Sequence, residues 1–501
     1  MSTAVDSGPG WRRLHRRTVL VTALVTAGVA AGAAVPVTVA LSGRLGYAAA
    51  IGWVLAGAAL LIGCAAAGDY VRWRRTRYRV GTERVDLHTG LLLVKRRSLA
   101  RERIRSVDLT AHPLLRILGM VSVRIGTGEH SGGDSTLTLD PVSRAEGERL
   151  RRELLDRAAS GASGTHREGE LATLDLRWVR YAPVSFVAPM LGGAAAGGVM
   201  QISEWVGAQG EVIDWVADRF RDTPLVWAIV TLVVAALVAG VVGALGLWIE
   251  MWWNYRLERE PGGTLRVRRG LFTSRSLSVE ERRLRGVDLV EPLGVRLAGA
   301  ARVDAIATGL TKDEERHADH ETLLPAAPRA LADSIAAEVL REPVSPTGAS
   351  LTGHPLAARS RRLRRALSVA LAPVLVQVVL GVLLTPVLLR TALACAVVSV
   401  PVAVLLAVDA YRSLGHALSG SYLVTRSGTV RRSTAALQRA GVIGWTVKQS
   451  WFQRRAGLLS VTATTAAGGG AYTAHDTDAS EGLRFAADAV PGLLEPFLDR
   501  D

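Results

Sequence analysis

Long apolar stretches alternate with polar segments along the chain, and the first two stretches lie almost end to end. No charged residue occurs in residues 18–43 or 45–68, and Arg44 alone separates the two runs. Each run has about 24 residues, roughly 36 Å as a helix, which is enough to cross a hydrocarbon core of about 30 Å. The pattern predicts a hairpin of two transmembrane helices rather than a secretory signal, whose apolar region is shorter.

Two further pairs of apolar stretches repeat this pattern. The second pair covers about residues 182–203 and 225–249, and the third covers about residues 366–389 and 391–408, divided by Arg390. The loop inside the second pair is mostly acidic and contains two tryptophans, which favours a position along the membrane interface. We therefore expect six transmembrane helices in three hairpins.

A short segment occurs three times, once behind each hairpin. From the equivalent positions Ile104, Leu284 and Val442, an Arg, a Gly and a Val follow at the same three distances in every copy, without any gap. These repeated residues are Arg116, Gly119, Val123, Arg296, Gly299, Val303, Arg454, Gly457 and Val461. The chain is therefore an internal repeat of roughly 160 residues, each repeat being a hairpin followed by a soluble domain.

Each soluble domain has a β pattern that ends in a helical one. Alternating apolar and polar residues begin at RYRV (77–80), NYRLE (254–258) and SYLVT (421–425), and turn residues separate the short runs that follow. The last segment of each repeat has apolar residues at i, i+3 and i+4. We expect three small antiparallel sheets or barrels, each capped by a C-terminal helix that covers an otherwise open sheet end.

The run SLARERIRSVDLTAHPLLRILGMVSVRIGTG (98–128) resembles the bacterial pleckstrin-homology-like (PH-like) domain of YdbS/YdbT-type membrane proteins. The residues that carry the resemblance are Ile104, Ser106, Val107, Arg116, Gly119, Val123 and Gly128. The third copy departs from it, with Gly441 and Trp445 in place of an Arg and a Val. The resemblance implies a mixed membrane protein with three PH-like antiparallel β-barrel domains, and a task tied to envelope stress or antimicrobial resistance.

The expected organisation alternates hairpins and domains along the whole chain. In order, it comprises a cytoplasmic N-terminal segment (1–17), transmembrane hairpin 1 (18–68), PH-like domain 1 (69–160), a linker (161–181), hairpin 2 with its acidic external loop (182–249), PH-like domain 2 (250–342), a linker (343–365), hairpin 3 (366–408) and PH-like domain 3 (409–501).

Composition and charge agree with membrane spans separated by soluble domains. Hydrophobic residues make up 49% of the chain and the mean hydropathy is +0.24, yet 21% of residues are charged. The net charge of +15 comes from arginines that crowd the ends of the apolar stretches, as the positive-inside rule requires, so nucleic-acid binding is not expected. Both termini and the soluble segments are predicted to lie on the cytoplasmic side of a bacterial plasma membrane.

Patterns typical of catalytic and metal sites are missing from the sequence. It has no GxxxxGK[ST] or HExxH motif, and no GxSxG between a strand and a helix. GTGEHSGG (126–133) is expected to be a hairpin loop, and His317 and His320 lie in a charged loop without a third ligand. Cys64 and Cys395 lie within apolar stretches. The sequence predicts a protein that is not an enzyme and has no cofactor or metal.

Clusters of basic residues are the better candidates for binding. The first cluster comprises Lys95, Arg96, Arg97, Arg101, Arg103 and Arg105, and the second comprises Arg282, Arg283 and Arg285. Such clusters bind anionic headgroups or a protein partner, although a solvated face beside the membrane has the same composition. The repeated Arg116, Arg296 and Arg454, each close to its Gly, are expected to be structural rather than ligand-binding.

The expected function is non-catalytic interaction at the inner leaflet. We expect the three PH-like domains to meet membrane lipids, a membrane or cytoplasmic protein, or other copies of this chain, and no nucleic acid. A transporter or export component is the alternative, but charged residues are absent from the interiors of the apolar stretches, and Gln377 is their most polar residue.

Overall fold

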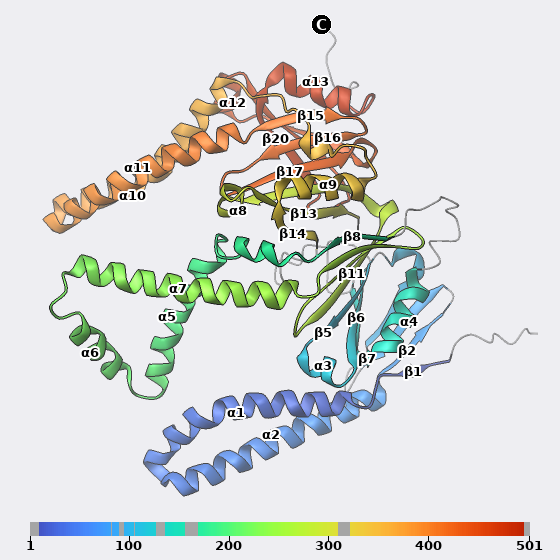
Figure 1. The fold of residues 1–501 in the computed structure, drawn as a ribbon, viewed down its shortest axis with the longest axis vertical. Helices are drawn as coiled ribbons and strands as arrows, with labels where there is room; N and C mark the ends of the chain where they lie inside the picture. Colours follow the sequence, from blue (N-terminus) through green and yellow to red (C-terminus); the bar gives the residue numbers. More distant parts are fainter. Residues whose placement is uncertain are drawn as a thin grey trace, which may run out of the picture. The chain divides into compact units, whose positions relative to one another are not determined.

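The computed structural model describes residues 10–81, 83–89, 95–104, 106–126, 136–155, 169–308 and 321–494. The chain folds as two compact units, Met1–Glu280 and Glu281–Asp501 (Figure 1). We call them the N-terminal unit and the C-terminal unit. The division falls inside the second repeat, so each unit combines parts of two successive repeats.

Long helices form the predicted hairpins. In the N-terminal unit, α1 (Thr18–Leu45) packs along α2 (Tyr47–Arg75), and α5 (Val187–Trp205) packs along α7 (Leu225–Trp252), with α6 (Gln209–Arg219) between them in the chain (Figure 1). In the C-terminal unit, α10 (Leu356–Leu383) packs along α11 (Pro386–Arg412).

Among the described helices, five are long and apolar enough to cross a membrane, namely α1, α2, α7, α10 and α11. Five of the six predicted spans are thus helices with the length and composition that a span requires. The remaining helix, α5, has 19 residues and packs closely on α7. A Cβ added at Gly192 or Gly240 would lie about 2 Å from a carbonyl oxygen of the facing helix, so the two backbones touch where only glycine fits.

A four-stranded sheet opens the soluble part of the N-terminal unit. Its strands, in spatial order, are β1 (Arg12–Arg13), β2 (Arg77–Val80), β3 (Arg84–Thr89) and β4 (Lys95–Ala100). Burial alternates along β2 and β3, as their apolar–polar alternation predicts, with Tyr78, Val85 and Leu87 facing the core. This sheet belongs entirely to the first repeat and its N-terminal flank.

A seven-stranded antiparallel sheet joins the first repeat to the second. Its spatial order is β7 (Thr136–Ser143), β6 (Met120–Gly126), β5 (Ser106–Ala111), β11 (Ser274–Glu280), β10 (Thr264–Arg269), β9 (Arg256–Glu260) and β8 (Gly169–Thr173). The junction is the antiparallel pair β5–β11, in which Ala111 lies opposite Ser274 and Ser106 opposite Val279. The second half of one domain therefore continues into the first half of the next.

The C-terminal unit repeats this arrangement. Its six-stranded sheet has the order β14 (Thr322–Pro328), β13 (Ala300–Ala307), β12 (Leu284–Pro292), β17 (Arg431–Gln438), β16 (Tyr422–Ser427) and β15 (Gly415–Ser419). The junction here is the pair β12–β17. The third repeat also forms a three-stranded sheet of β18 (Gly444–Lys448), β19 (Leu458–Thr464) and β20 (Ala471–Asp478).

The strands of one repeat thus do not form one sheet, and the prediction of three separate β-barrels is not confirmed. The sequence pattern gave each strand a buried face, but the hydrogen bonds of a strand edge can be satisfied by any strand of matching register. In the first two repeats the fourth strand pairs with the next repeat. In the third repeat the equivalent strand, β18, is an edge strand among the strands that the structure describes.

Short helices carry the repeated Arg–x–x–Gly motif. They are α3 (Pro113–Ile117), α8 (Leu293–Leu297) and α12 (Trp451–Arg455). The repeated glycines Gly119, Gly299 and Gly457 end these helices with φ values of 69°, 71° and 65°. Because residues with a Cβ are strained in this left-handed region, the recurrence of Gly has a conformational reason.

A longer helix follows the last strand of each repeat, as predicted. These helices are α4 (Arg144–Leu155), α9 (Arg329–Leu340) and α13 (Ala479–Ala489), and each packs on the strands that precede it. Fully buried Val107, Val123, Ile125, Leu139 and Leu150 form the core beneath α4. The remaining described helices are the 3₁₀ turns η1 (Arg101–Arg103), η3 (Leu176–Tyr181), η4 (Glu281–Arg283), η5 (Pro346–Gly348) and η6 (Arg439–Gly441).

Candidate functional site

The first basic cluster is only partly described, and its members have different surroundings. Arg96 is exposed on β4, whereas Arg97 is half-buried. Arg101 donates hydrogen bonds to the backbone oxygens of Gly81 and Glu153, which ties η1 to its own domain. The side chains of Lys95 and Arg103, and the whole of Arg105, lie outside the described residues.

The second basic cluster lies in the C-terminal unit. Arg282 is exposed and Arg283 is half-buried, both in η4. Arg285 is half-buried, and its Cδ lies 3.3 Å from the position that a Cβ on Gly441 would occupy. A side chain at Gly441, where the other repeats have an Arg, would therefore contact Arg285 closely. His317, His320 and the loop 127–133 lie outside the described residues.

The repeated arginines of the first two repeats contact the repeat that follows. Arg116 donates a hydrogen bond to the backbone oxygen of Leu271, and Arg296 forms a 2.8 Å ion pair with Asp409 at the end of α11. Arg454 belongs to the last repeat, and its exposed side chain has no hydrogen bond or ion pair with the described residues. The repeated arginine therefore has a different environment in the third repeat than in the first two.

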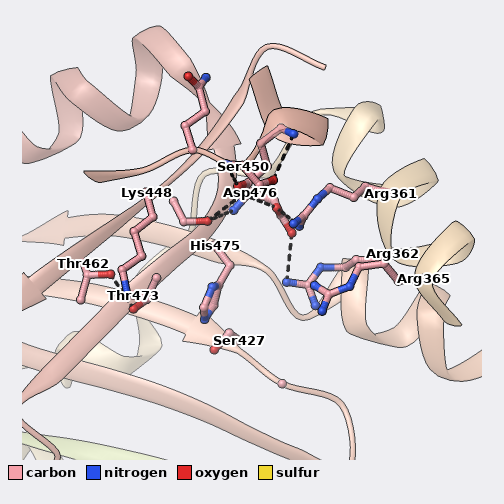
Figure 2. Close-up of a pocket in the computed structure, with 14 residues that line it drawn as sticks. Arg361, Arg362, Arg365, Ser427, Lys448, Ser450, Thr462, Thr473, His475 and Asp476 are labelled. Carbon is pink, nitrogen blue, oxygen red and sulfur yellow. Dashed lines mark hydrogen bonds and ion pairs between the residues drawn. The ribbon is translucent and has the colours of Figure 1, made fainter. Parts of the chain in front are cut away.

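A cavity of about 790 Å³ lies at the base of the third hairpin. The first turns of α10 supply Arg361, Arg362 and Arg365, and the open edge strand β18 supplies Lys448. Arg365 lies three residues after Arg362 and four after Arg361, and both spacings place side chains next to one another on a helix. Figure 2 shows them on one side of the cavity and Lys448 on the other.

Strands β19 and β20 form the floor of this basic cavity. Thr462 and Thr473 lie opposite one another, with 2.9 Å between their hydroxyl oxygens (Figure 2). His475 follows on β20 and also lines the cavity. Burial lowers the pKa of His475, and the charge of Arg362 lowers it further, so the imidazole is neutral at pH 7. The floor thus offers hydroxyl and imidazole groups rather than charges.

Asp476 holds two of the arginines in place. Its carboxylate is buried, with Oδ2 3.4 Å from Arg362, and Oδ1 accepts hydrogen bonds from Arg361 and, at 2.9 Å, from Gln453 (Figure 2). Gln453 belongs to a capping box with Ser450 at the start of α12. The backbone of Asp476 has a φ of 56°, a left-handed conformation that Asp tolerates better than most residues. A strained backbone thus positions the carboxylate between the arginines.

A second cavity, of about 530 Å³, lies at the base of the first hairpin. It is lined by Arg12, Arg13 and Arg16 together with Trp73 and Glu146. Here Glu146 neutralises part of the charge, because it forms ion pairs with Arg12 at 3.0 Å and with Arg149 at 2.5 Å. The cavity at the third hairpin therefore has the larger unbalanced positive charge.

The side chains of the basic cavity are suited to binding an anion. Guanidinium and ammonium groups with nearby hydroxyls match the oxygens of a phosphate or carboxylate. Within the described ranges, no group of three or more His, Cys, Asp and Glu side chains is arranged to hold a metal ion. The sequence shows arginines at the ends of the apolar stretches, but Lys448 was not among the predicted binding residues. Its one signal in the sequence is the difference from Thr110 and Val290, which occupy the same position in the other repeats.

Fold and sequence together define a membrane protein built from repeated PH-like modules. The family model described as "Bacterial PH domain" matches residues 27–158, 212–343 and 366–487, which is most of the chain. The chain therefore belongs to the bacterial PH domain family, and the three matches coincide with the three repeats.

A curated relative supports the same assignment over most of the length. The chain is 20% identical over 411 residues to "UPF0699 transmembrane protein YdbT" of Bacillus subtilis (strain 168), covering 79% of this chain and 80% of that protein. The chain is thus a YdbT-type PH-domain membrane protein. No solved structure gives a significant match.

Proposed function

We propose that this protein is a non-catalytic membrane anchor that holds its PH-like domains at the cytoplasmic face of the bacterial plasma membrane and binds anionic lipids there. The proposal includes α5 as a sixth span and places both termini in the cytoplasm. The basic flanks of the hairpins support this orientation, since Lys and Arg accumulate on the cytoplasmic side.

The observation that carries the proposal is the short connection between each hairpin and the sheet that follows it. Thr76 alone separates α2 from β2, residues 253–255 separate α7 from β9, and residues 413–414 separate α11 from β15. Sheets connected so closely to the hairpins are expected to begin near the membrane surface. Basic side chains there lie within about one Debye length, roughly 8 Å, of anionic headgroups, where each contributes about 1 kcal/mol to membrane attraction.

The test is purification of the full-length protein in mild detergent, followed by mass spectrometry of co-purifying lipids and proteins. Lipid binding predicts enrichment of anionic phospholipids over the bulk membrane, compared with an unrelated six-span protein purified in the same way. Anionic lipids at their bulk proportion, together with a stoichiometric protein partner, would replace this proposal with protein scaffolding. The full chain is required, because β5 of the first domain pairs with β11 of the second.

Transport is the competing function, and the third hairpin allows a direct test. The side-chain oxygen of Gln377 in α10 is buried and has no hydrogen-bond partner among the described residues. If a substrate passes through this hairpin, Gln377→Leu should abolish the flux of that substrate in cells. An anchor predicts that this variant is as functional as the wild type, because leucine satisfies the apolar packing of a span.

A further inference from the structure

The basic cavity at the base of the third hairpin has an unusual balance of charge. Four cationic side chains line it, namely Arg361, Arg362, Arg365 and Lys448, and Asp476 is the one carboxylate among the described lining residues. Asp476 is already engaged by Arg361, Arg362 and Gln453. The side chains of Arg365 and Lys448 have no hydrogen bond or ion pair with any residue that the structure describes. These two cations face the cavity without a counter-charge.

The cavity lies beside a strand edge that has no partner among the described strands. Lys448 is on β18, an edge strand among the described strands, whereas the equivalent strands β5 and β12 are paired with the next repeat. The first two repeats have uncharged residues, Thr110 and Val290, at the position of Lys448. A lysine on an open edge prevents unwanted strand pairing, but it does not require three arginines on the opposite wall. Together, Lys448 and the arginines give the cavity a charge that matches a negatively charged ligand.

The position of the cavity relative to the third hairpin restricts the source of that charge. Arg365 is the last charged residue of α10 before its apolar part, which begins at Ala366. A helix that spans the bilayer places this arginine at the level of the headgroups, where long basic side chains extend towards the interface. A volume of about 790 Å³ is also within the range of sites for small ligands, so it is large enough for a headgroup.

We propose that this cavity is a binding site for a phosphate group, with Arg365 and Lys448 contacting its oxygens from opposite walls and Thr462, Thr473 and His475 donating hydrogen bonds from the floor. Asp476 is a positioning residue that orients Arg361 and Arg362. The site deepens the proposed function, on which it rests, by giving the lipid-binding anchor one defined pocket. The phosphate belongs either to an anionic phospholipid or to a soluble phosphate ester.

The test uses the full-length protein in nanodiscs and a pair of charge-matched variants. Arg365→Gln/Lys448→Gln removes the two unpaired cations of the cavity. Arg359→Gln/Arg364→Gln removes two exposed cations of the same helix that do not line the cavity, and so serves as the control. None of the four side chains has a partner among the described residues, so both variants are expected to fold. Hydrogen exchange of residues 448–450 and 471–476 reports on the cavity itself.

Two ligand arms distinguish the sources of phosphate. One compares nanodiscs of phosphatidylcholine with nanodiscs that also contain phosphatidylglycerol, and the other adds inorganic phosphate or glycerol 1-phosphate to the first kind. We expect phosphatidylglycerol to protect the cavity segments in the wild type and the control. Arg365→Gln/Lys448→Gln should bind it roughly 30-fold more weakly, because each lost charge contributes about 1 kcal/mol. Protection by the soluble esters alone would assign the same site to a soluble ligand.

The proposal is overturned if neither ligand protects the cavity segments, or if Arg365→Gln/Lys448→Gln responds as the wild type does. After either result, lipid enrichment in mild detergent still tests the proposed function independently of the cavity. If the wild type and this variant enrich anionic lipids equally in mild detergent, lipid binding stands and the pocket is wrong. If the wild type shows no enrichment, lipid binding itself is wrong.

Discussion

The two junctions between repeats use the same strand pairing with different chemistry. In the N-terminal unit, β5–β11 is accompanied by an ion cluster in which Arg151 of α4 and Arg266 of β10 bind Glu148 and Glu260. In the C-terminal unit, the β-ladder registers place Val424 at the position of Arg266. Both residues are buried, with 2% and 0% of their surface exposed.

This difference shows that the paired backbones, and not a particular ion pair, define the junction. Buried ion pairs are often no more stabilising than the apolar groups that replace them, because desolvation offsets the attraction. The C-terminal unit uses a charged contact elsewhere, where Glu291 on β12 accepts hydrogen bonds from Arg329 of α9 and Arg432 of β17. Ala111 occupies the position of Glu291 in the N-terminal unit.

The largest effect on stability is expected when Arg266 is replaced by valine, the residue that the other junction has at this position. Arg266→Val leaves Glu148 and Glu260 with one arginine instead of two. We expect a loss of about 3 kcal/mol of stability, because the carboxylates then keep buried charge that is not fully compensated. Adding Arg151→Ala and Glu260→Ser should restore most of this stability. These substitutions copy Ala336 and Ser419, which occupy the equivalent positions of the C-terminal unit. Hydrogen exchange of β5 and β11 in the full-length protein measures both. A triple variant no more stable than Arg266→Val would show that the ion cluster is indispensable.

Acid should weaken the C-terminal unit more than the N-terminal unit. His354 and His416 have ring nitrogens 3.1 Å apart, and His416 occupies the position of Leu257 in the other unit. Burial, and then the charge of His416, lowers the pKa of His354 to about 4, and burial also lowers the pKa of His416. The unfolded chain therefore binds more protons below about pH 6.5, so stability is complete above that pH and falls between about 6.5 and 4.

The expected loss between pH 7 and pH 5 is about 1–2 kcal/mol. This loss should appear in hydrogen exchange: between pH 7 and pH 5, β15 and β16 should lose more protection than β9 and β10. His354→Gln cannot be protonated and should reduce the pH dependence, and equal acid sensitivity of both units would contradict the prediction.

Replacing the repeated arginines should change stability by a smaller amount, and by different amounts in different repeats. Arg296→Ala removes the ion pair with Asp409, and we expect about 1 kcal/mol of destabilisation because the pair is partly exposed. Arg454→Ala removes a side chain without a described partner and should change the apparent Tm by less than about 1 °C. Thermal unfolding in detergent compares the two variants directly. Equal shifts would mean that the arginines act within their own repeats rather than between them.

The smallest effect on stability is expected from two equivalent carboxylates on the junction strands. Burial raises the pKa of Asp108 to about 7 and that of Asp288 to about 6, and a 2.6 Å hydrogen bond from Ser433 opposes the shift of Asp288. A raised pKa means that stability falls as pH rises from about 4 through 7. Asp108→Asn should therefore stabilise by up to about 1 kcal/mol at pH 8 and have little effect at pH 5. The apparent Tm at both pH values measures this, and Asp288→Asn should gain less.

Sequence patterns predicted the hairpins, the three repeats and the closing helices, because each depends on local periodicity. They did not predict that β5 pairs with β11 rather than within its own repeat, since Val107 and Leu109 face the core in either arrangement. The basic cavity was equally hidden, because Lys448 and Asp476 meet Arg361 only through folding of distant segments. The substitution of Lys448 for Thr110 and Val290 was the one local signal.

Strand sharing between repeats also has a consequence for biosynthesis. Strand β5 is synthesised well before β11, with a complete hairpin between them in the chain. At about 5–20 residues per second, roughly 10–30 s pass before its partner emerges from the ribosome. During this interval β5 has an open edge, so we expect the nascent protein to depend on chaperones, or on rapid membrane insertion of the second hairpin, to avoid mispairing with other chains.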